Sequence, residues 1–213
     1  AKMPPPLRGE ILRQIGDALR AKKDALGALT TLEMGKIRSE GLGEVQEYID
    51  ICDMATGMSR TISGSVIPSE RPDHWMMEVW NPVGIVGVIT AFNFPVAVSG
   101  WNTALSLIAG DLVLWKPALT TCLVTIAIQN LVAGVLKKHG FNSVCTVCCG
   151  DGPDIGNELV NDKRIPLVSF TGSTAVGRSI SKTVHERFGR TILELGGNNA
   201  TIVLPDADLE IAF

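Results

Sequence analysis

The sequence predicts an α/β fold: a Rossmann-like parallel sheet with helices on both faces, plus a short β-hairpin arm. From Val83 onward, short apolar runs typical of strands alternate with segments of helix length. Repeated strand–helix units form parallel sheets with right-handed crossovers. Hydrophobic residues make up 46% and charged residues 19% of the 213 residues, which favours a packed core over disorder. The 22 Gly and 11 Pro fit many short turns between such elements.

Residues 1–60 are expected to form a helical N-terminal part of this domain. Leu7, Ile11, Ile15 and Leu19 recur at every fourth position, the spacing of the buried face of an amphipathic helix. A second helix is expected over 45–56, where apolar residues recur at spacings of three and four.

Residues 61–80 change character and are expected to form a β-hairpin. Gly64, Pro68 and Pro72 interrupt short apolar runs there. Residues 81–213 are then expected to form the sheet domain itself. Its expected strands are 84–90, 111–115, 144–148, 167–170, 191–195 and 201–204, and its expected helices follow Pro95 and cover 121–138, 154–161 and 174–188.

The C-terminal residues predict the first turn of a helix. Asp206 stands at a capping position and acidic residues occupy the first turn, but the sequence stops at Phe213 after barely one turn. A helix needs more length to be stable. We therefore expect the natural protein to continue past Phe213.

Composition argues against several classes of protein. A net charge of −3 does not suit a nucleic-acid partner, which needs a clustered basic surface. Five Cys at irregular spacing indicate reduced intracellular thiols rather than a disulfide framework. The run Cys145-x2-Cys148-Cys149 lacks a second ligand pair, so we expect buried thiols and no metal. For the uncharged segment 117–136, a helix covering the sheet is favoured over a membrane-spanning helix.

Two glycine-containing loops follow predicted strands and precede helices. Backbone N–H groups at such a helix start bind phosphate, and Gly172-x4-Gly177-Arg178-Ser179 nearly matches a P-loop. That motif needs Lys where Arg178 stands, which weakens a phosphotransferase interpretation. The second loop, 150–156, departs from the dinucleotide fingerprint G-x-G-x-x-G by one residue.

Two further side chains stand at the ends of predicted strands. Glu194 precedes Gly196-Gly197, and an apolar strand end can raise the pKa of a carboxyl group toward the range of a general base. Asn93 follows the first strand of the sheet, where its amide can donate a hydrogen bond to an oxyanion. An exposed acid and a turn-forming Asn are the plain structural alternatives.

Together these segments resemble the aldehyde dehydrogenase superfamily, over essentially the whole chain. The resemblance rests on the order and spacing of Phe-Asn-Phe-Pro at 92–95, Trp-Lys-Pro at 115–117, Phe-Thr-Gly-Ser-Thr at 170–174 and Glu-Leu-Gly-Gly at 194–197. Segments 43–53, 89–98, 186–190 and 198–200 are most similar to the antiquitin family, the alpha-aminoadipic semialdehyde dehydrogenases of lysine catabolism.

The resemblance implies NAD-dependent oxidation of an aldehyde, through a Cys thiohemiacetal and a thioester. It implies that Asn93 is the oxyanion donor, that Glu194 is the general base, and that Glu47 and Trp101 contact the substrate. It also implies that Lys116 binds the adenosine ribose and Ser173 the pyrophosphate. The cofactor-binding positions it implies are Ile89, Thr90, Lys116, Gly152, Pro153, Gly156, Gly172, Ser173, Leu195 and Gly196.

The expected location, which the reduced thiols favour, is intracellular and cytoplasmic, with a mitochondrial form as the alternative. Because 61–80 resembles part of an oligomerisation arm, a homo-oligomer, a tetramer, is expected. Three departures matter: Leu119 stands where many members carry Glu, Pro117 stands where Gly is expected in close antiquitin relatives, and none of the five Cys matches the nucleophile, which is expected past Phe213. A non-catalytic dinucleotide-binding chain is therefore the first alternative, and a P-loop phosphotransferase the second.

Overall fold

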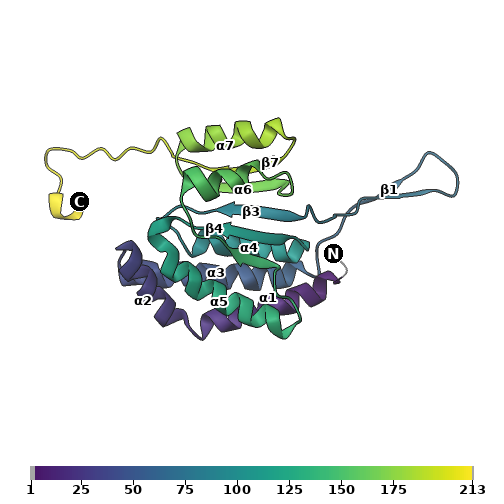
Figure 1. Ribbon diagram of the computed structural model, residues 1–213, viewed down its shortest axis with the longest axis horizontal. Helices are drawn as coiled ribbons and strands as arrows, with labels where there is room; N and C mark the ends of the chain where they lie inside the picture. Colours follow the sequence, from purple (N-terminus) through teal and green to yellow (C-terminus); the bar gives the residue numbers. More distant parts are fainter. Residues whose placement is uncertain (1–2, 213) are drawn as a thin grey trace.

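The computed structural model describes residues 3–212, whose centre is a five-stranded parallel sheet in the order β5-β4-β3-β6-β7. Helices lie on both sides of this sheet (Figure 1), which confirms the predicted fold class. The strands are β3 (Ile85–Ile89), β4 (Leu112–Lys116), β5 (Cys145–Val147), β6 (Leu167–Thr171) and β7 (Arg190–Glu194).

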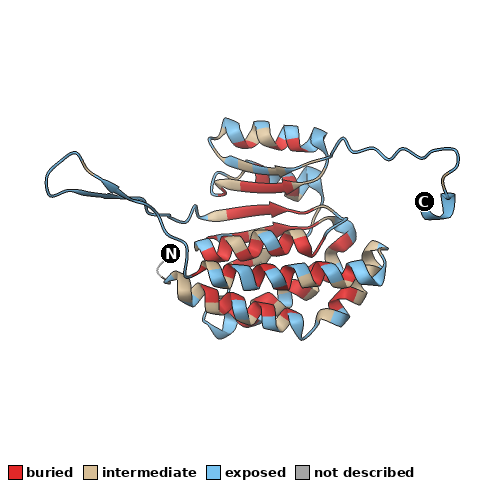
Figure 2. Ribbon diagram, turned by 180° about the vertical axis from the view of Figure 1, so that it is seen from behind, coloured by how far each residue is buried: buried red, intermediate tan, exposed pale blue. Residues whose placement is uncertain are grey.

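The larger helical layer packs on one face of the sheet through a continuous apolar core. Val86 and Val88 of β3 and Val113 and Trp115 of β4 belong to this core, together with buried side chains of five helices. Figure 2 shows the buried residues concentrated there. The helices on this side are α1 (Pro5–Arg20), α2 (Lys23–Met34), α3 (Arg38–Met58), α4 (Ala97–Ala109) and α5 (Cys122–Lys138), the last preceded by the 3-10 turn η1 (Leu119–Thr121).

A smaller layer covers the opposite face. It contains α6 (Asn157–Asn161), preceded by a π-helical turn η2 (Gly152–Gly156), and α7 (Thr174–Glu186). Val168 and Phe170 of β6 pack there against Ile180 and Val184 of α7. The predicted α-helix over 154–161 is therefore π-helical up to Gly156 and α-helical only from Asn157 to Asn161.

The helical layer differs from the sequence prediction at two points. Helix α2 was not predicted, because its buried face carries Leu26, Gly27 and Thr30 rather than an apolar stripe. Leu7, counted in the stripe of α1, is 56% exposed because it lies in the first turn of that helix, at the edge of the core.

The segment Leu119–Lys138 is long and apolar enough to cross a membrane by length and composition alone. In the structure, one side of α5 packs against α1, α2 and β5, and the buried residues Val124, Ile128 and Val132 belong to the main core. This is the arrangement expected of a helix that covers a parallel sheet.

Two extensions project from opposite ends of the domain (Figure 1). One is the predicted hairpin, in which β1 (Val66–Pro68) pairs antiparallel with β2 (Trp75–Met77). The other follows β7 and ends in the short helix α8 (Leu209–Ala212). The predicted strand 201–204 is wrong: this segment is extended but pairs with no strand among residues 3–212, and Ile202 is 85% exposed. A strand needs a neighbour for its backbone hydrogen bonds, and the tail leads away from the sheet.

Candidate functional site

The predicted cofactor residues lie where the parallel strands end. Ile89 ends β3 and pairs in register with Lys116 at the end of β4. On the other side of β3, Thr171 at the end of β6 pairs with Glu194 at the end of β7. Ligands of open α/β sheets bind at this carboxyl edge, so the structure brings the predicted residues to the edge where such sheets bind ligands.

Lys116 carries its ammonium group at this edge in a nearly buried position. The residue is 7% exposed, and its Nζ donates a hydrogen bond to the carbonyl of Pro117 at 3.1 Å. An ammonium group has three donors, so two more can serve a ligand such as the ribose hydroxyls of a dinucleotide. Thr90, the next residue after β3, is less available, because its hydroxyl accepts a hydrogen bond from the indole of Trp115 at 2.9 Å.

The loop after β5 lies beside Lys116. Asp151 caps the turn by accepting a hydrogen bond from the N–H of Asp154 at 2.9 Å, and Gly152 and Pro153 open it. A Cβ atom added to Gly156 would lie 3.9 Å from Cε of Lys116, whereas one added to Gly152 would meet nothing within 4 Å. The loop therefore has two residues without side chains, Gly152 and Gly156, next to a nearly buried cation, which fits the adenosine end of a dinucleotide.

The turn between β6 and α7 fits a phosphate only in part. The N–H of Gly172 donates to the carbonyl of Glu194 at 3.0 Å, so it is not free to bind an anion as the sequence suggested. The hydroxyl of Ser173 caps α7 by accepting from the N–H of Val176 at 3.3 Å. Helix geometry leaves the first N–H groups of α7, those of Thr174 and Ala175, as donors to an anion.

Glu194 and Leu195 form the other side of the carboxyl edge. Leu195 packs tightly on α7, because a side chain on Gly177 would collide with it. Glu194 is exposed, so the described residues do not give it the apolar surroundings that the sequence suggested. Gly196 is exposed as well, at the start of the tail.

The two predicted substrate residues contact each other. The indole Nε1 of Trp101 on α4 donates a hydrogen bond to Oε1 of Glu47 on α3 at 2.6 Å. The two helices approach closely because residue 100 is glycine, where a Cβ atom would collide with the ring of Tyr48. Glu47 is exposed and lies off the buried stripe of α3, as expected from its position in the sequence.

A cavity of about 750 Å³ joins these groups. It runs along β6 and β7 on the side of α4, and its lining includes Glu47, Trp101, Glu194 and Leu195. Three acidic residues, Glu47, Asp111 and Glu194, and an indole thus line one space beside the cofactor edge. Asn93 is not part of this lining, although the loop that carries it precedes α4.

Two residues around Asn93 were missed by the sequence analysis. Lys36 Nζ donates to the carbonyl of Asn93 at 2.7 Å and to Oε1 of Glu44 at 2.6 Å. The available signal was Glu44 itself, an acid that shares the buried stripe of α3 with Tyr48 and Cys52 at spacings of four. Buried acids are rare unless they are paired.

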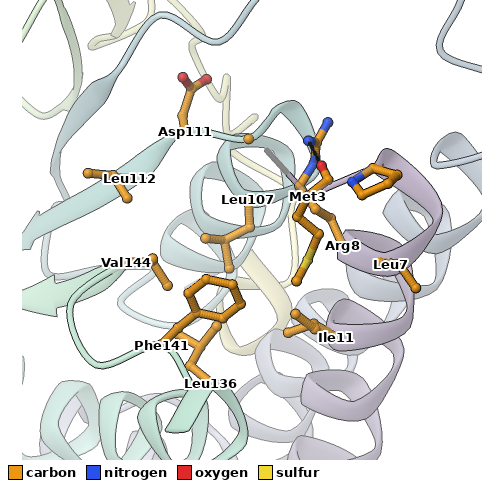
Figure 3. Close-up of a pocket in the computed structure, with 12 residues that line it drawn as sticks. Met3, Leu7, Arg8, Ile11, Leu107, Asp111, Leu112, Leu136, Phe141 and Val144 are labelled. Carbon is orange, nitrogen blue, oxygen red and sulfur yellow. Dashed lines mark hydrogen bonds between the residues drawn. The ribbon is translucent and has the colours of Figure 1, made fainter. Parts of the chain in front are cut away.

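A second cavity, of about 590 Å³, lies near the amino ends of β4 and β5 (Figure 3). Apolar side chains such as Ile11, Leu107 and Phe141 dominate its lining. Its cation is already engaged, because Arg8 donates to the carbonyls of Ile108 and Met3 at 2.9 and 2.6 Å. No sequence-predicted site residue lines this cavity.

Burial raises the pKa of four of the five thiols, those of Cys52, Cys122, Cys145 and Cys148. The pKa of the Cys52 and Cys145 thiols rises to about 12, so both stay protonated at neutral pH. Cys149, expected to be buried, is exposed because it lies past the end of the strand. Among residues 3–212, no group of three or more His, Cys, Asp or Glu side chains is placed to hold a metal ion.

Comparison with known proteins gives a consistent result. The sequence model of the aldehyde dehydrogenase family matches residues 1–213. Aldehyde dehydrogenase family 7 member A1 of Pisum sativum is 59% identical over 211 residues, 99% of this chain and 41% of that protein. Alpha-aminoadipic semialdehyde dehydrogenase of Bos taurus is 56% identical over 212 residues, 99% of this chain and 39% of that protein. The chain thus spans about two fifths of the length of these curated relatives.

Solved structures show the same fold. Betaine aldehyde dehydrogenase of Staphylococcus aureus, in complex with NAD+, is 31% identical with a TM-score of 0.89, covering 100% of this chain and 42% of that one. Glyceraldehyde-3-phosphate dehydrogenase of Methanocaldococcus jannaschii, complexed with NADP, is 33% identical with a TM-score of 0.89, covering 98% and 45%. With the family match over its whole length, the chain belongs to the aldehyde dehydrogenase family.

Proposed function

We propose that these 213 residues form the cofactor-binding part of an NAD-dependent enzyme that oxidises alpha-aminoadipic semialdehyde to the carboxylic acid. One observation carries the proposal: the carboxyl edge places Lys116 and the 152–156 loop on one side and Glu194 and its cavity on the other. A dinucleotide lying across this edge would bring its reactive end to the cavity. The NAD+ held by the Staphylococcus aureus relative supports this cofactor.

The proposed reaction consumes one aldehyde, one NAD+ and one water, and yields the acid, NADH and a proton. A Cys thiolate, which none of the five Cys of this chain matches, adds to the carbonyl carbon. NAD+ supplies the electron acceptor for the hydride of the resulting thiohemiacetal carbon, which leaves a thioester. Water then adds to the thioester carbon and the thiolate leaves.

Glu194 and Asn93 take the polar steps in this proposal. The Glu194 carboxylate, at the end of β7 and facing the cavity, accepts the proton of the attacking water. The side-chain amide of Asn93, with the N–H of the nucleophile, donates hydrogen bonds to the oxygen that becomes negative in each addition step. Neither role needs a metal ion.

Glu47 and Trp101 give the cavity its proposed preference for an amino-aldehyde. The Glu47 carboxylate already accepts a hydrogen bond from Trp101, and its remaining lone pairs are available to a substrate ammonium group. The indole provides an apolar wall for the carbon chain. The Bos taurus relative, named for this semialdehyde, supports the same substrate.

A homo-oligomer, a tetramer, belongs to the same proposal. The hairpin exposes a row of large apolar side chains to solvent, among them Trp75, Met76 and Met77. An exposed apolar surface of this kind is typical of a protein–protein interface. Size-exclusion chromatography with light scattering on the natural full-length protein tests this.

The decisive test has two parts. Calorimetric titration of the 213-residue chain should show binding of NAD+, and ATP alone should not bind. The natural full-length protein should then form NADH from NAD+ and alpha-aminoadipic semialdehyde, measured by absorbance, and should use a straight-chain aldehyde without the amino group less well. NAD+ binding without turnover of any aldehyde would favour a non-catalytic dinucleotide-binding protein. ATP binding without NAD+ binding would favour a phosphotransferase.

A further inference from the structure

One buried ion pair, Lys36–Glu44, forms hydrogen bonds to the backbone of the loop that carries Asn93. Nζ of Lys36 lies 2.6 Å from Oε1 of Glu44, and only 10% and 2% of the two side chains are exposed. The second oxygen of Glu44, Oε2, accepts hydrogen bonds from the N–H groups of Val96 at 2.9 Å and Ala97 at 3.3 Å. Glu44 therefore satisfies donors at the start of α4, on the C-terminal side of Asn93.

Lys36 holds the same loop at Asn93 itself. Besides Glu44, its ammonium group donates to the Asn93 carbonyl at 2.7 Å and lies 4.0 Å from the centre of the Phe94 ring. Lys36 can reach this point because Gly35 ends α2 with a positive φ of 81°, which turns the chain sharply before α3. One ion pair thus fixes the loop at Asn93, at Phe94 and at the first turn of α4.

We propose that Lys36 and Glu44 are positioning residues, which set the direction of the Asn93 side-chain amide. This inference rests on the proposed function, in which that amide is an oxyanion donor. Asn93 is exposed, so its side chain is not directed by packing in a core. Its own carbonyl is instead tied to a buried charge, and a hydrogen bond to a charged group is stronger than a neutral one. An oxyanion donor accelerates a reaction only when its direction is fixed beforehand.

The test is a double-mutant cycle in the natural full-length protein. Lys36→Met alone would leave Glu44 buried and unpaired, so the variant is Lys36→Met with Glu44→Gln, in which Gln can still accept from the N–H of Val96. We expect kcat to fall about ten- to a hundredfold, the range for a misplaced group, with the KM for aldehyde and the Kd for NAD+ unchanged. Asn93→Ala should cost roughly 10² to 10³ in kcat.

The cycle separates positioning from general damage. If Lys36 and Glu44 act through Asn93, the paired change should lower kcat less than twofold when Asn93 is already Ala. An equal loss in both backgrounds would overturn the inference, and so would no loss with native Asn93. A loss below threefold for Asn93→Ala would instead remove the proposed oxyanion role, and the inference with it.

Two further variants guard against misfolding. Lys36→Arg keeps the charge opposite Glu44 but spreads its donors over a wider plane, so it should fold and lose kcat to an intermediate degree. The matched control is Arg20→Met with Asp53→Asn, which removes an exposed pair of 2.9 Å between α1 and the same helix α3 without touching the loop. It should leave kcat unchanged, and a loss equal to that of the Lys36 and Glu44 pair would overturn the inference.

Discussion

The two cavities of this domain differ in what their polar groups are doing. In the amino-end cavity, the guanidinium of Arg8 is committed to backbone carbonyls, and apolar side chains complete the lining. In the cavity along β6 and β7, the carboxylates of Glu47 and Glu194 face open space, and neither forms an ion pair within residues 3–212. The first arrangement satisfies the charged group within the fold, whereas the second leaves carboxylates that can bind a charged ligand.

The difference between the two cavities lies in which of their polar groups are already engaged within the protein. The amino-end cavity lies against core helices, and its Arg8 offers a ligand few hydrogen bonds that are not already formed. The other cavity places Glu194 at a strand end and Glu47 on α3, and neither carboxylate forms an ion pair within residues 3–212. Substitutions beside the carboxyl edge should therefore lower turnover or NAD+ binding, whereas substitutions in the amino-end cavity should lower the free energy of unfolding.

The largest effect on activity is expected from Glu194→Gln in the natural full-length protein. The amide cannot accept the proton of the attacking water, so steady-state turnover should fall by roughly 10² to 10⁴, the usual contribution of a general base. Rapid-mixing measurements should still show a first burst of NADH, because in the proposed reaction hydride transfer precedes the hydrolysis. Glu186→Gln, an exposed acid at the end of α7, is the matched control and should have no effect. Unchanged turnover in Glu194→Gln would remove its role as base.

The carboxyl edge was predictable because its residues follow from local patterns. Each strand of the sheet is a short apolar run, and each of Asn93, Lys116, Ser173 and Glu194 stands at or just after the end of such a run. In a parallel sheet these ends share one edge, so the sequence order alone predicts their convergence.

What the sequence could not predict depends on contacts between distant segments. Glu44 is separated from the N–H of Val96 by 52 residues, and Lys36 from the carbonyl of Asn93 by 57. The same holds for the failed strand 201–204, whose apolar residues suit a strand but find no partner in the described part of the chain. Helix α2 was missed because small residues mediate its packing: a Cβ on Gly27 would collide with Leu42.

A smaller effect is expected from Lys116→Met at the cofactor side. Met fits the buried position without its charge, so the chain should fold while losing hydrogen bonds from an ammonium group to the ligand. Such bonds contribute about 1.5–3 kcal/mol, so the Kd for NAD+ should rise roughly ten- to a hundredfold. Calorimetric titration of the 213-residue chain measures it, with Lys137→Met, on the last turn of α5, as control. A Kd within twofold of the parent would place the ribose elsewhere.

The smallest effect on ligand binding is expected in the amino-end cavity. Ile11 is buried in the main core and lines that cavity, so Ile11→Ala should lower the free energy of unfolding by about 2–5 kcal/mol, the range for such truncations. Urea unfolding measures this loss. The Kd for NAD+, titrated without denaturant, should stay within twofold of the parent, because Ile11 lines the amino-end cavity and does not line the cavity beside the carboxyl edge. A rise of tenfold or more in that Kd would mean that the two ends of the sheet are energetically coupled. The polar groups around Lys116 would then depend on the packing of α1, and the division between a cavity for folding and a cavity for chemistry would fail.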